Sequence, residues 1–330
     1  MRNLGKLAVL GITALGLALA GPQDNSLVIG ASQEPRVLAG DFLRVISNQA
    51  IKSEIEQYLF APFIGFNADS QNFPVLATEV PTLENGRLRV TDIGGGKKRL
   101  EMDITIRPDA KWSDGRPITT EDVAFYFEVG KAKGMPVLNP DFWERVNVRI
   151  KDARNFTLIF EPAYYYDTYG PINTYAPKHI MGPEWERVKA AARGLDPDKD
   201  AEKLNELYRN FFLKFATPQA LNRGAMVYSG PFKLKRWVPG NSIEMERNPN
   251  FPIKPEGGES KYVQKVVYRF IQNTNSLLVA VIGGSIDATS SVSLTFDQGR
   301  SPQLVRRAPG RFDIWFVPGA IWEHIDINKF

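Results

Sequence analysis

The sequence predicts a mixed α/β fold, and three observations support this. Apolar and polar residues alternate strictly over residues 100–107, which predicts a strand with one buried face. Apolar residues at helical spacing over 42–66, and a long charged stretch over 184–215, predict helices. The composition, with 43% hydrophobic and 24% charged residues, is typical of globular proteins and argues against collagen-like, coiled-coil or wholly disordered chains. A chain of 330 residues is long enough for more than one domain.

In the first half of the chain, we expect a short buried strand at 26–31 and a hairpin. The hairpin joins 87–92 to 100–107 around three consecutive glycines, residues 94–96. The segment WSDG at 112–115 predicts a tight turn, because glycine adopts a positive φ without steric cost. A helix then follows, with Thr119 as its cap, Asp122 three residues on, and a buried stripe of Val123, Tyr126 and Phe127.

In the second half, Gly194 to Pro197 is expected to divide 184–215 into two helices. Strands are expected at 230–237 and 242–246, and the Pro239-Gly240 pair between them suits a type II turn. Two further core strands are predicted at the positions 263–271 and 311–317.

Residues 1–20 are interpreted as a signal peptide. Arg2 and Lys6 precede an apolar run that ends in Ala18-Leu19-Ala20, the order of a charged region, an apolar region and a small-residue cleavage site. The run of about 14 residues would span roughly 21 Å, short of a ~30 Å hydrocarbon core. We therefore expect secretion, cleavage after Ala20 and a soluble chain in a bacterial periplasm. The sequence has no Cys, so it can have neither disulfides nor a lipid-bearing cysteine.

Few residue patterns indicate chemistry. The two histidines, His179 and His324, do not form a metal-spaced pair, and none of the common nucleophile, phosphate-loop or dinucleotide motifs occurs. No metal, cofactor or catalytic residue is therefore expected. A net charge of +4 spread along the chain is not a nucleic-acid-binding signature. A carboxylate pair of a secreted glycosidase is not excluded, although turn and cap chemistry explains Asp114, Glu121 and Asp122.

Tyrosines gather in a short segment, at positions 164, 165, 166, 169 and 175. Three consecutive tyrosines cannot all face one core, so at least one should point out of a loop. Tyrosine suits a pocket wall or an interface because it offers a flat ring and a hydroxyl at low entropy cost. Half-buried surface packing explains the cluster equally well.

The segment AKWSDGRPITTEDV at 110–123 resembles the signature of the family 5 extracellular solute-binding proteins, the periplasmic oligopeptide-, dipeptide- and nickel-binding receptors of ABC importers. Thr120 stands where the family usually has Ala. Further segments resemble family landmarks in the same order: QEP at 33–35, LATE at 76–79 (without the family's Trp), APKHI at 176–180, SGPFKL to ERNPNF at 229–251, and GSID at 284–287.

This resemblance implies a two-lobe periplasmic-binding-protein type II-like α/β fold with an extra domain II. It implies domain I at 21–50 and again at 222–272, domain II at 51–221, and the start of a second lobe at 273–330. Family members continue well beyond the point that resembles residues 323–328, where this chain ends. We therefore expect an incomplete second lobe and a truncated chain.

The resemblance also implies a binding protein rather than an enzyme. It would be a monomer that captures peptides for a membrane-embedded permease and its ATPase subunits. Ligand contacts are expected at Ser47, Asn48, Gln49, Phe142, Trp143 and Tyr166. A polar helix cap explains the first three equally well. The alternatives are an oligosaccharide or nickel-chelate receptor of the same family, a secreted carboxylate-pair hydrolase, and a truncated remnant that binds nothing.

Overall fold

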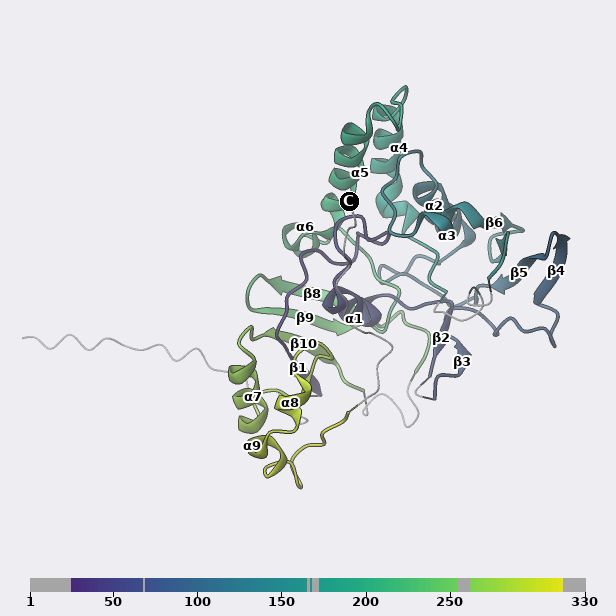
Figure 1. Cartoon of the computed structure of the whole chain (residues 1–330). Coiled ribbons are helices and arrows are strands. Elements are labelled where there is room, and N and C mark those ends of the chain that lie inside the picture. The colour runs from purple at the N-terminus through teal and green to yellow at the C-terminus, as the bar shows by residue number, and fades with distance from the viewer. Residues whose placement is uncertain (1–24, 68, 165–166, 168–171, 255–261, 317–330) are drawn as a thin grey trace, which may run out of the picture.

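The computed structural model describes residues 25–67, 69–164, 167, 172–254 and 262–316. These residues form one five-stranded and one four-stranded sheet, a short two-stranded ribbon, and helices packed between and around them (Figure 1). The mixed α/β prediction is therefore confirmed. The predicted signal peptide, Tyr166 and the segment 317–330 lie outside the described residues.

The five-stranded sheet has the order β11-β1-β10-β9-β8. The first strand, β1 (Ser26–Ala31), is parallel to both β10 (Lys265–Phe270) and β11 (Ala288–Thr289). The remaining strands, β9 (Ser242–Arg247) and β8 (Phe232–Val238), are antiparallel neighbours. Both faces of β1 are buried, which is typical of a strand with parallel neighbours in the interior of a sheet.

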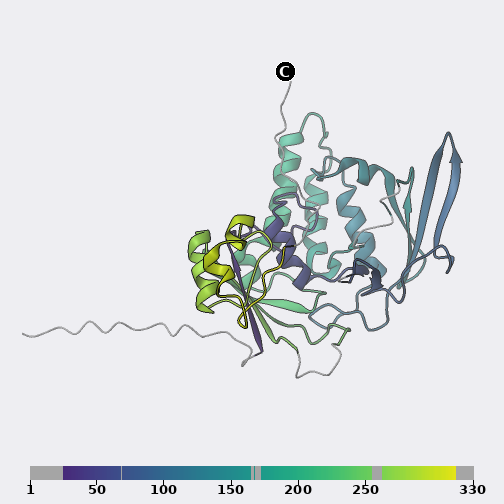
Figure 2. The same cartoon turned by 60° about the horizontal axis from the view of Figure 1, so that its bottom comes forward.

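The four-stranded sheet has the order β4-β5-β7-β6, all antiparallel. Its strands are β4 (Leu88–Gly94), β5 (Lys97–Thr105), β7 (Asn155–Phe160) and β6 (Val146–Ile150). Leu100, Met102 and Ile104 are buried, as the alternation predicts. The β4–β5 hairpin projects from the body of the molecule at the right of Figure 2. The ribbon pairs β2 (Ile64–Phe66) with β3 (Asn72–Pro74).

The longer helices lie on both sides of the sheets: α1 (Ala50–Leu59) packs against β8, and α7 (Thr274–Gly283) against β1. At the top of Figure 1, α4 (Lys178–Ala191) and α5 (Ala201–Ala216) lie side by side, next to α2 (Thr120–Gly130). The short helices are α3 (Pro140–Arg145), α6 (Pro218–Asn222), α8 (Phe296–Gly299) and α9 (Pro302–Val305). In the described part of the chain, no helix is long and apolar enough to cross a membrane.

The local signals at the start of α2 are confirmed. The Thr119 hydroxyl accepts from a backbone N–H of the first turn, while the Asp122 carboxylate accepts from the Thr119 N–H at 3.1 Å. Gly115 has φ 90°, and its N–H donates to the Trp112 carbonyl. The turn at 238–241 has Gly240 at φ 73°, as a type II turn requires.

Two large hydrophobic clusters make up most of the core. One lies between the five-stranded sheet, α1, α4 and α5, and the other lies under the four-stranded sheet. Phe60, Tyr126, Trp143 and Ile180 are partly buried and pack against both clusters. These four side chains connect the two halves of the described structure.

Two expectations about elements are wrong. The predicted helix at 42–66 is confined to α1, because the Asp41 carboxylate accepts from the backbone N–H groups of Ile46 and Ser47 and stabilises a turn instead. Residues 311–316 of the strand predicted at 311–317 are not extended β structure, and no described strand pairs with them; residue 317 lies outside the described residues. Trp315 in this segment is 81% exposed.

Candidate functional site

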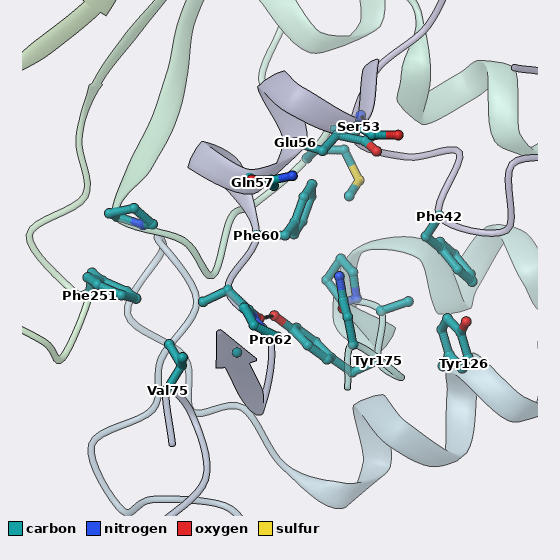
Figure 3. Close-up of a pocket in the computed structure, with 18 of the residues that line it drawn as sticks. Phe42, Ser53, Glu56, Gln57, Phe60, Pro62, Val75, Tyr126, Tyr175 and Phe251 are labelled. Atoms are coloured by element: carbon teal, nitrogen blue, oxygen red, sulfur yellow. Dashed lines mark hydrogen bonds between the residues drawn. The ribbon is translucent and has the colours of Figure 1, made fainter. Parts of the chain in front are cut away.

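A cavity of about 670 Å³ lies beside α1, where segments from four regions of the chain meet (Figure 3). Ser53, Glu56 and Gln57 face it from α1, and Pro62 and Tyr175 face it from the other side. The remaining lining residues are Ala39, Phe42, Arg44, Phe60, Ala61, Gly65, Phe66, Phe73, Val75, Tyr126, Asn173, Ala176, Pro177, Met226, Pro231 and Phe251. A cavity of this size with mostly apolar walls and a few polar groups is typical of small-ligand sites.

Aromatic side chains form much of the wall. Phe42 and Tyr126 lie together with ring centroids 5.5 Å apart, and Phe60 and Tyr175 line the cavity between α1 and the ribbon. The Tyr175 hydroxyl is buried and bonded to the Ala61 carbonyl and to Ser229 Oγ. Burial raises the pKa of Tyr175 above the ordinary tyrosine range, so this side chain stays a neutral structural group. Of the predicted tyrosine cluster, Tyr164 is exposed, as expected of at least one member.

The polar part of the wall is concentrated near the start of α1. Arg44 Nη1 donates to Asn48 Oδ1 at 2.9 Å and to Ser53 Oγ at 2.7 Å. Gln57 on α1 and Asn173 across the cavity add amide groups that can both donate and accept hydrogen bonds. Amides and hydroxyls in these positions can pair with the polar backbone of an extended ligand.

Glu56 is held by a buried cation. Lys52 Nζ lies 3.0 Å from Glu56 Oε1 and 4.0 Å from Asp41 Oδ2, and it donates to the Asp41 backbone carbonyl at 3.0 Å. Burial raises the pKa values of Asp41 and Glu56, while Lys52 opposes the rise in both. The ion pair keeps Glu56 fixed at the edge of the cavity.

The predicted ligand residues do not line this cavity where they are described. Ser47 Oγ donates to Gln49 Oε1, which also accepts from the Arg36 N–H, and Asn48 accepts from Arg44. These contacts place Ser47, Asn48 and Gln49 directly before α1, next to the polar wall but outside the lining.

Phe142 and Trp143 lie in α3, where Trp143 packs against Tyr126 with ring centroids 5.4 Å apart. Tyr126 lines the cavity, so Trp143 lies next to a lining residue, while Phe142 packs against Trp143 with ring centroids 5.5 Å apart. Tyr166 lies outside the described residues. Ligand contact by these six residues remains a prediction.

The sequence analysis missed Arg44, Ser53, Glu56 and Gln57. The last three are spaced three and four residues apart, which places them on one face of a helix. That spacing was a detectable signal, but only once α1 is known to begin at residue 50. Arg44 gave no such signal because its position depends on an irregular loop.

A second hollow lies between α2 and α4 and is lined by Glu121 and Asp122, two of the three acidic residues considered in the sequence, whereas Asp114 is outside its lining. Asp114 Oδ2 is 2.9 Å from His179 Nε2, and Asp122 is occupied by Thr119, Trp112 and the Lys178 N–H. Turn, cap and inter-element contacts therefore account for Asp114 and Asp122, and Glu121 pairs with Lys178 at the surface. Within the described residues, no cluster of potential metal ligands occurs.

Residues 97–318 match the model "bacterial extracellular solute-binding proteins, family 5 Middle", and the chain belongs to this family. The resemblance noted in the sequence is thus confirmed.

Similar proteins are named for binding rather than catalysis. The chain is 24% identical over 270 residues to the oligopeptide-binding protein AppA of Bacillus subtilis, covering 80% of this chain and 40% of AppA. It is 30% identical over 199 residues to the peptidoglycan-binding protein YepA of Agrobacterium fabrum, covering 58% of this chain and 26% of YepA.

Solved structures agree on the fold. The structure of Bacillus subtilis AppA in complex with a nonapeptide has a TM-score of 0.54 at 22% identity, covering 79% of this chain and 43% of AppA. The periplasmic EDTA-binding protein EppA has a TM-score of 0.57 at 15% identity, covering 83% of this chain and 45% of EppA. The chain thus spans less than half the length of these relatives.

Proposed function

We propose that this chain is a peptide-capturing component of an ABC importer and that the cavity beside α1 receives part of the peptide. The family match carries this proposal, and the AppA relative named for oligopeptide binding gives the ligand class. The proposed partners are a membrane-embedded permease and its ATPase subunits.

The cavity supports a peptide ligand in two ways. Its aromatic and apolar side chains can pack against varied ligand side chains without selecting one shape. Its amide and hydroxyl groups, from Gln57, Asn173 and Ser53, can satisfy backbone N–H and C=O groups that would otherwise lose water. Sugars also stack on aromatic rings, so the experiment compares the two ligand classes directly.

Thermal unfolding of residues 21–330 with a peptide library, an oligosaccharide panel and nickel chelates tests the ligand class. A ligand that binds only the folded chain stabilises it by about 2.7 kcal/mol at a concentration one hundred times its Kd. We expect peptides to raise the Tm, with a smaller rise for Phe251→Ala, which removes a ring from the wall. Val90→Ala, an exposed change on the distant β4, is the matched control.

If only oligosaccharides or only nickel chelates raise the Tm, those compounds and not peptides are the ligand class of this chain. Unchanged Tm values across all three panels would overturn the binding proposal for this chain.

We further propose that the protein works in the periplasm after removal of residues 1–20. N-terminal sequencing and intact mass of the protein from a periplasmic extract test this. The expected N-terminus is Gly21, and recovery of the protein with residues 1–20 still attached in the membrane fraction would contradict it.

A further inference from the structure

Arg44 lines the cavity and carries a positive charge. No carboxylate of the described residues forms an ion pair with it. Its side-chain hydrogen bonds go to Asn48 and Ser53, both neutral acceptors. Arginine carries its charge at every relevant pH and offers five N–H donors. By contrast, the buried Arg145 contacts two carboxylates, Asp141 at 2.9 Å and Asp167 at 2.8 Å.

The acidic residue in the cavity wall, Glu56, interacts with the charge of Arg44 at longer range but forms its ion pair with Lys52. Both oxygens of Glu56 lie 3.0 Å from Lys52 Nζ, and Lys52 is fully buried and cannot reach a ligand. Among the lining residues, Arg44 is therefore the cation that is positioned to meet a ligand.

The backbone that presents Arg44 is in an uncommon conformation. Ala39 and Arg44 have φ values of 60° and 58°, in the left-handed region that residues other than glycine rarely adopt. Both residues line the cavity. Unfavourable backbone conformations of this kind persist where surrounding contacts enforce them, and they cluster at functional sites.

The enforcing contacts come from α1. The Ala39 N–H donates to Glu56 Oε1 at 2.9 Å, and Lys52 Nζ donates to the Asp41 carbonyl at 3.0 Å. Asp41 in turn accepts from the Ile46 and Ser47 N–H groups. These bonds fix the segment 39–47 on α1, so the position of the Arg44 guanidinium is set before a ligand arrives.

We propose that Arg44 binds a carboxylate of the ligand, beside the aromatic wall formed by Phe42 and Tyr126. The proposal rests on the proposed function and narrows it to peptides that bring a carboxylate into this cavity. Guanidinium and carboxylate form short, charge-assisted and commonly bidentate hydrogen bonds, which give both affinity and orientation. The carboxylate can belong to the peptide C-terminus or to an acidic side chain, and the peptide panel distinguishes the two.

The test measures Kd by calorimetry for a peptide that raises the Tm of the wild-type chain and for two derivatives of it. One derivative has a C-terminal amide, and the other has neutral amides in place of its acidic side chains. The proteins are wild type, Arg44→Gln, Arg44→Lys and the control Arg36→Gln, which changes an exposed arginine eight positions away. Circular dichroism and the ligand-free Tm verify folding of each variant.

One derivative should bind the wild type about 10- to 100-fold more weakly than the parent peptide, and this derivative identifies the carboxylate. Arg44→Gln should weaken binding of the parent peptide by a similar factor and leave binding of that derivative nearly unchanged. Arg44→Lys should bind the parent peptide with an affinity between those of Arg44→Gln and the wild type. Arg36→Gln should bind all three peptides as the wild type does. If the wild type binds all three peptides equally, the Arg44 proposal is wrong while the proposed function stands. Measurements on the wild type are sufficient to show this. Absence of peptide binding to the wild type would instead overturn the proposed function.

Discussion

At the residue scale, the most consequential side chain is Lys52. It is fully buried in α1, with Glu56 one helical turn further on and Asp41 on the preceding loop. A buried cation between the buried Asp41 and the partly exposed Glu56 contributes little net stability as a group, but removing it leaves the carboxylates without compensation. The role of Lys52 is therefore to hold the segment 39–47 in place rather than to add net stability.

Lys52→Met should reduce the free energy of unfolding by about 3–5 kcal/mol at neutral pH, because the buried Asp41 and the partly exposed Glu56 lose their shared cation. Burial already raises the pKa values of both carboxyls, so the folded state binds their protons more tightly than the unfolded state does. The stability of the variant should therefore recover partly as the pH falls from 8 to 5.

Urea unfolding at the two pH values measures this. The control is Lys98→Met, which breaks the exposed pair with Asp92 on the hairpin and should cost less than about 1 kcal/mol. An equal cost for both variants would show that Lys52 does not compensate the buried carboxylates.

At the element scale, α1 is placed by close backbone contact with the segment before β8. The Gly230 N–H donates to the Leu59 carbonyl at 2.8 Å, at the last residue of α1. A Cβ at position 230 would lie 2.5 Å from the Leu59 backbone carbon and 2.6 Å from the Tyr58 carbonyl oxygen. Only glycine permits this approach, because the clashing atoms are backbone atoms that cannot rotate away.

Gly230→Ala should destabilise the fold by about 1–3 kcal/mol, as overpacking does, and should shift the α1 wall of the cavity. Gly182→Ala is the matched control: its added Cβ has ordinary contacts within α4, and alanine favours a helix by about 1 kcal/mol. The two variants should therefore shift the Tm in opposite directions. Equal shifts in thermal unfolding would contradict the requirement for glycine at position 230.

A charged ladder crosses the outer face of the four-stranded sheet. Asp103 on β5 lies 2.7 Å from Arg89 on β4 and 2.8 Å from Lys151, and it accepts from Thr157 on β7. Burial would raise the pKa of Asp103, but the hydrogen bonds from Arg89, Lys151 and Thr157 outweigh it and lower the pKa well below its usual range.

Because this pKa is lower in the folded state, the carboxylate stabilises the fold above its unfolded pKa of about 3.8. That stabilisation is lost as the pH falls from this value toward the folded pKa. Asp103→Asn should lower stability at pH 7 by about 2 kcal/mol and by progressively less below pH 4. Thermal unfolding from pH 7 to pH 2 measures the difference, and a constant difference would contradict the role of the charge.

Elements set by local chemistry were predictable from the sequence, and the site was not. The capping box at Thr119, the turn glycines 115 and 240, and the alternation in β5 depend on neighbours within a few residues. The cavity depends instead on a loop that Asp41 diverts from the helical pattern and on partners as distant as Phe251. Contacts of this kind produce no periodic pattern in a single sequence. The predicted segment Ser47–Gln49 therefore lies near the cavity but does not line it.

At the scale of the whole molecule, the two large clusters are joined by a few side chains, and Trp143 is central among them. Its ring contacts Tyr126 and Phe127 at centroid distances of 5.4 and 5.9 Å. Coupling through such side chains makes separate cores unfold together. The domain boundaries predicted at 50/51, 221/222 and 272/273 remain predictions.

Trp143→Ala should cost about 2–4 kcal/mol and separate the unfolding of the two halves. Hydrogen exchange of β5 and β10, one strand from each sheet, should show one common transition in the wild type and two in the variant. Peptide binding by the same variant tests the predicted ligand contact: an unchanged Kd would leave Trp143 with a structural role alone. Coincident transitions in the variant would show that other contacts couple the halves.

The position of β1 has a consequence for the order in which the protein is made. Residues 26–31 form the earliest described strand, yet their partners are residues 265–270 and 288–289. This strand, which lies between β11 and β10 in the five-stranded sheet, therefore stays without its neighbours until nearly the whole described chain has been synthesised. This sheet cannot be completed before residues 288–289 have been made, whereas the β4–β5 hairpin needs only residues 88–105, so the two sheets become able to form at very different stages of synthesis.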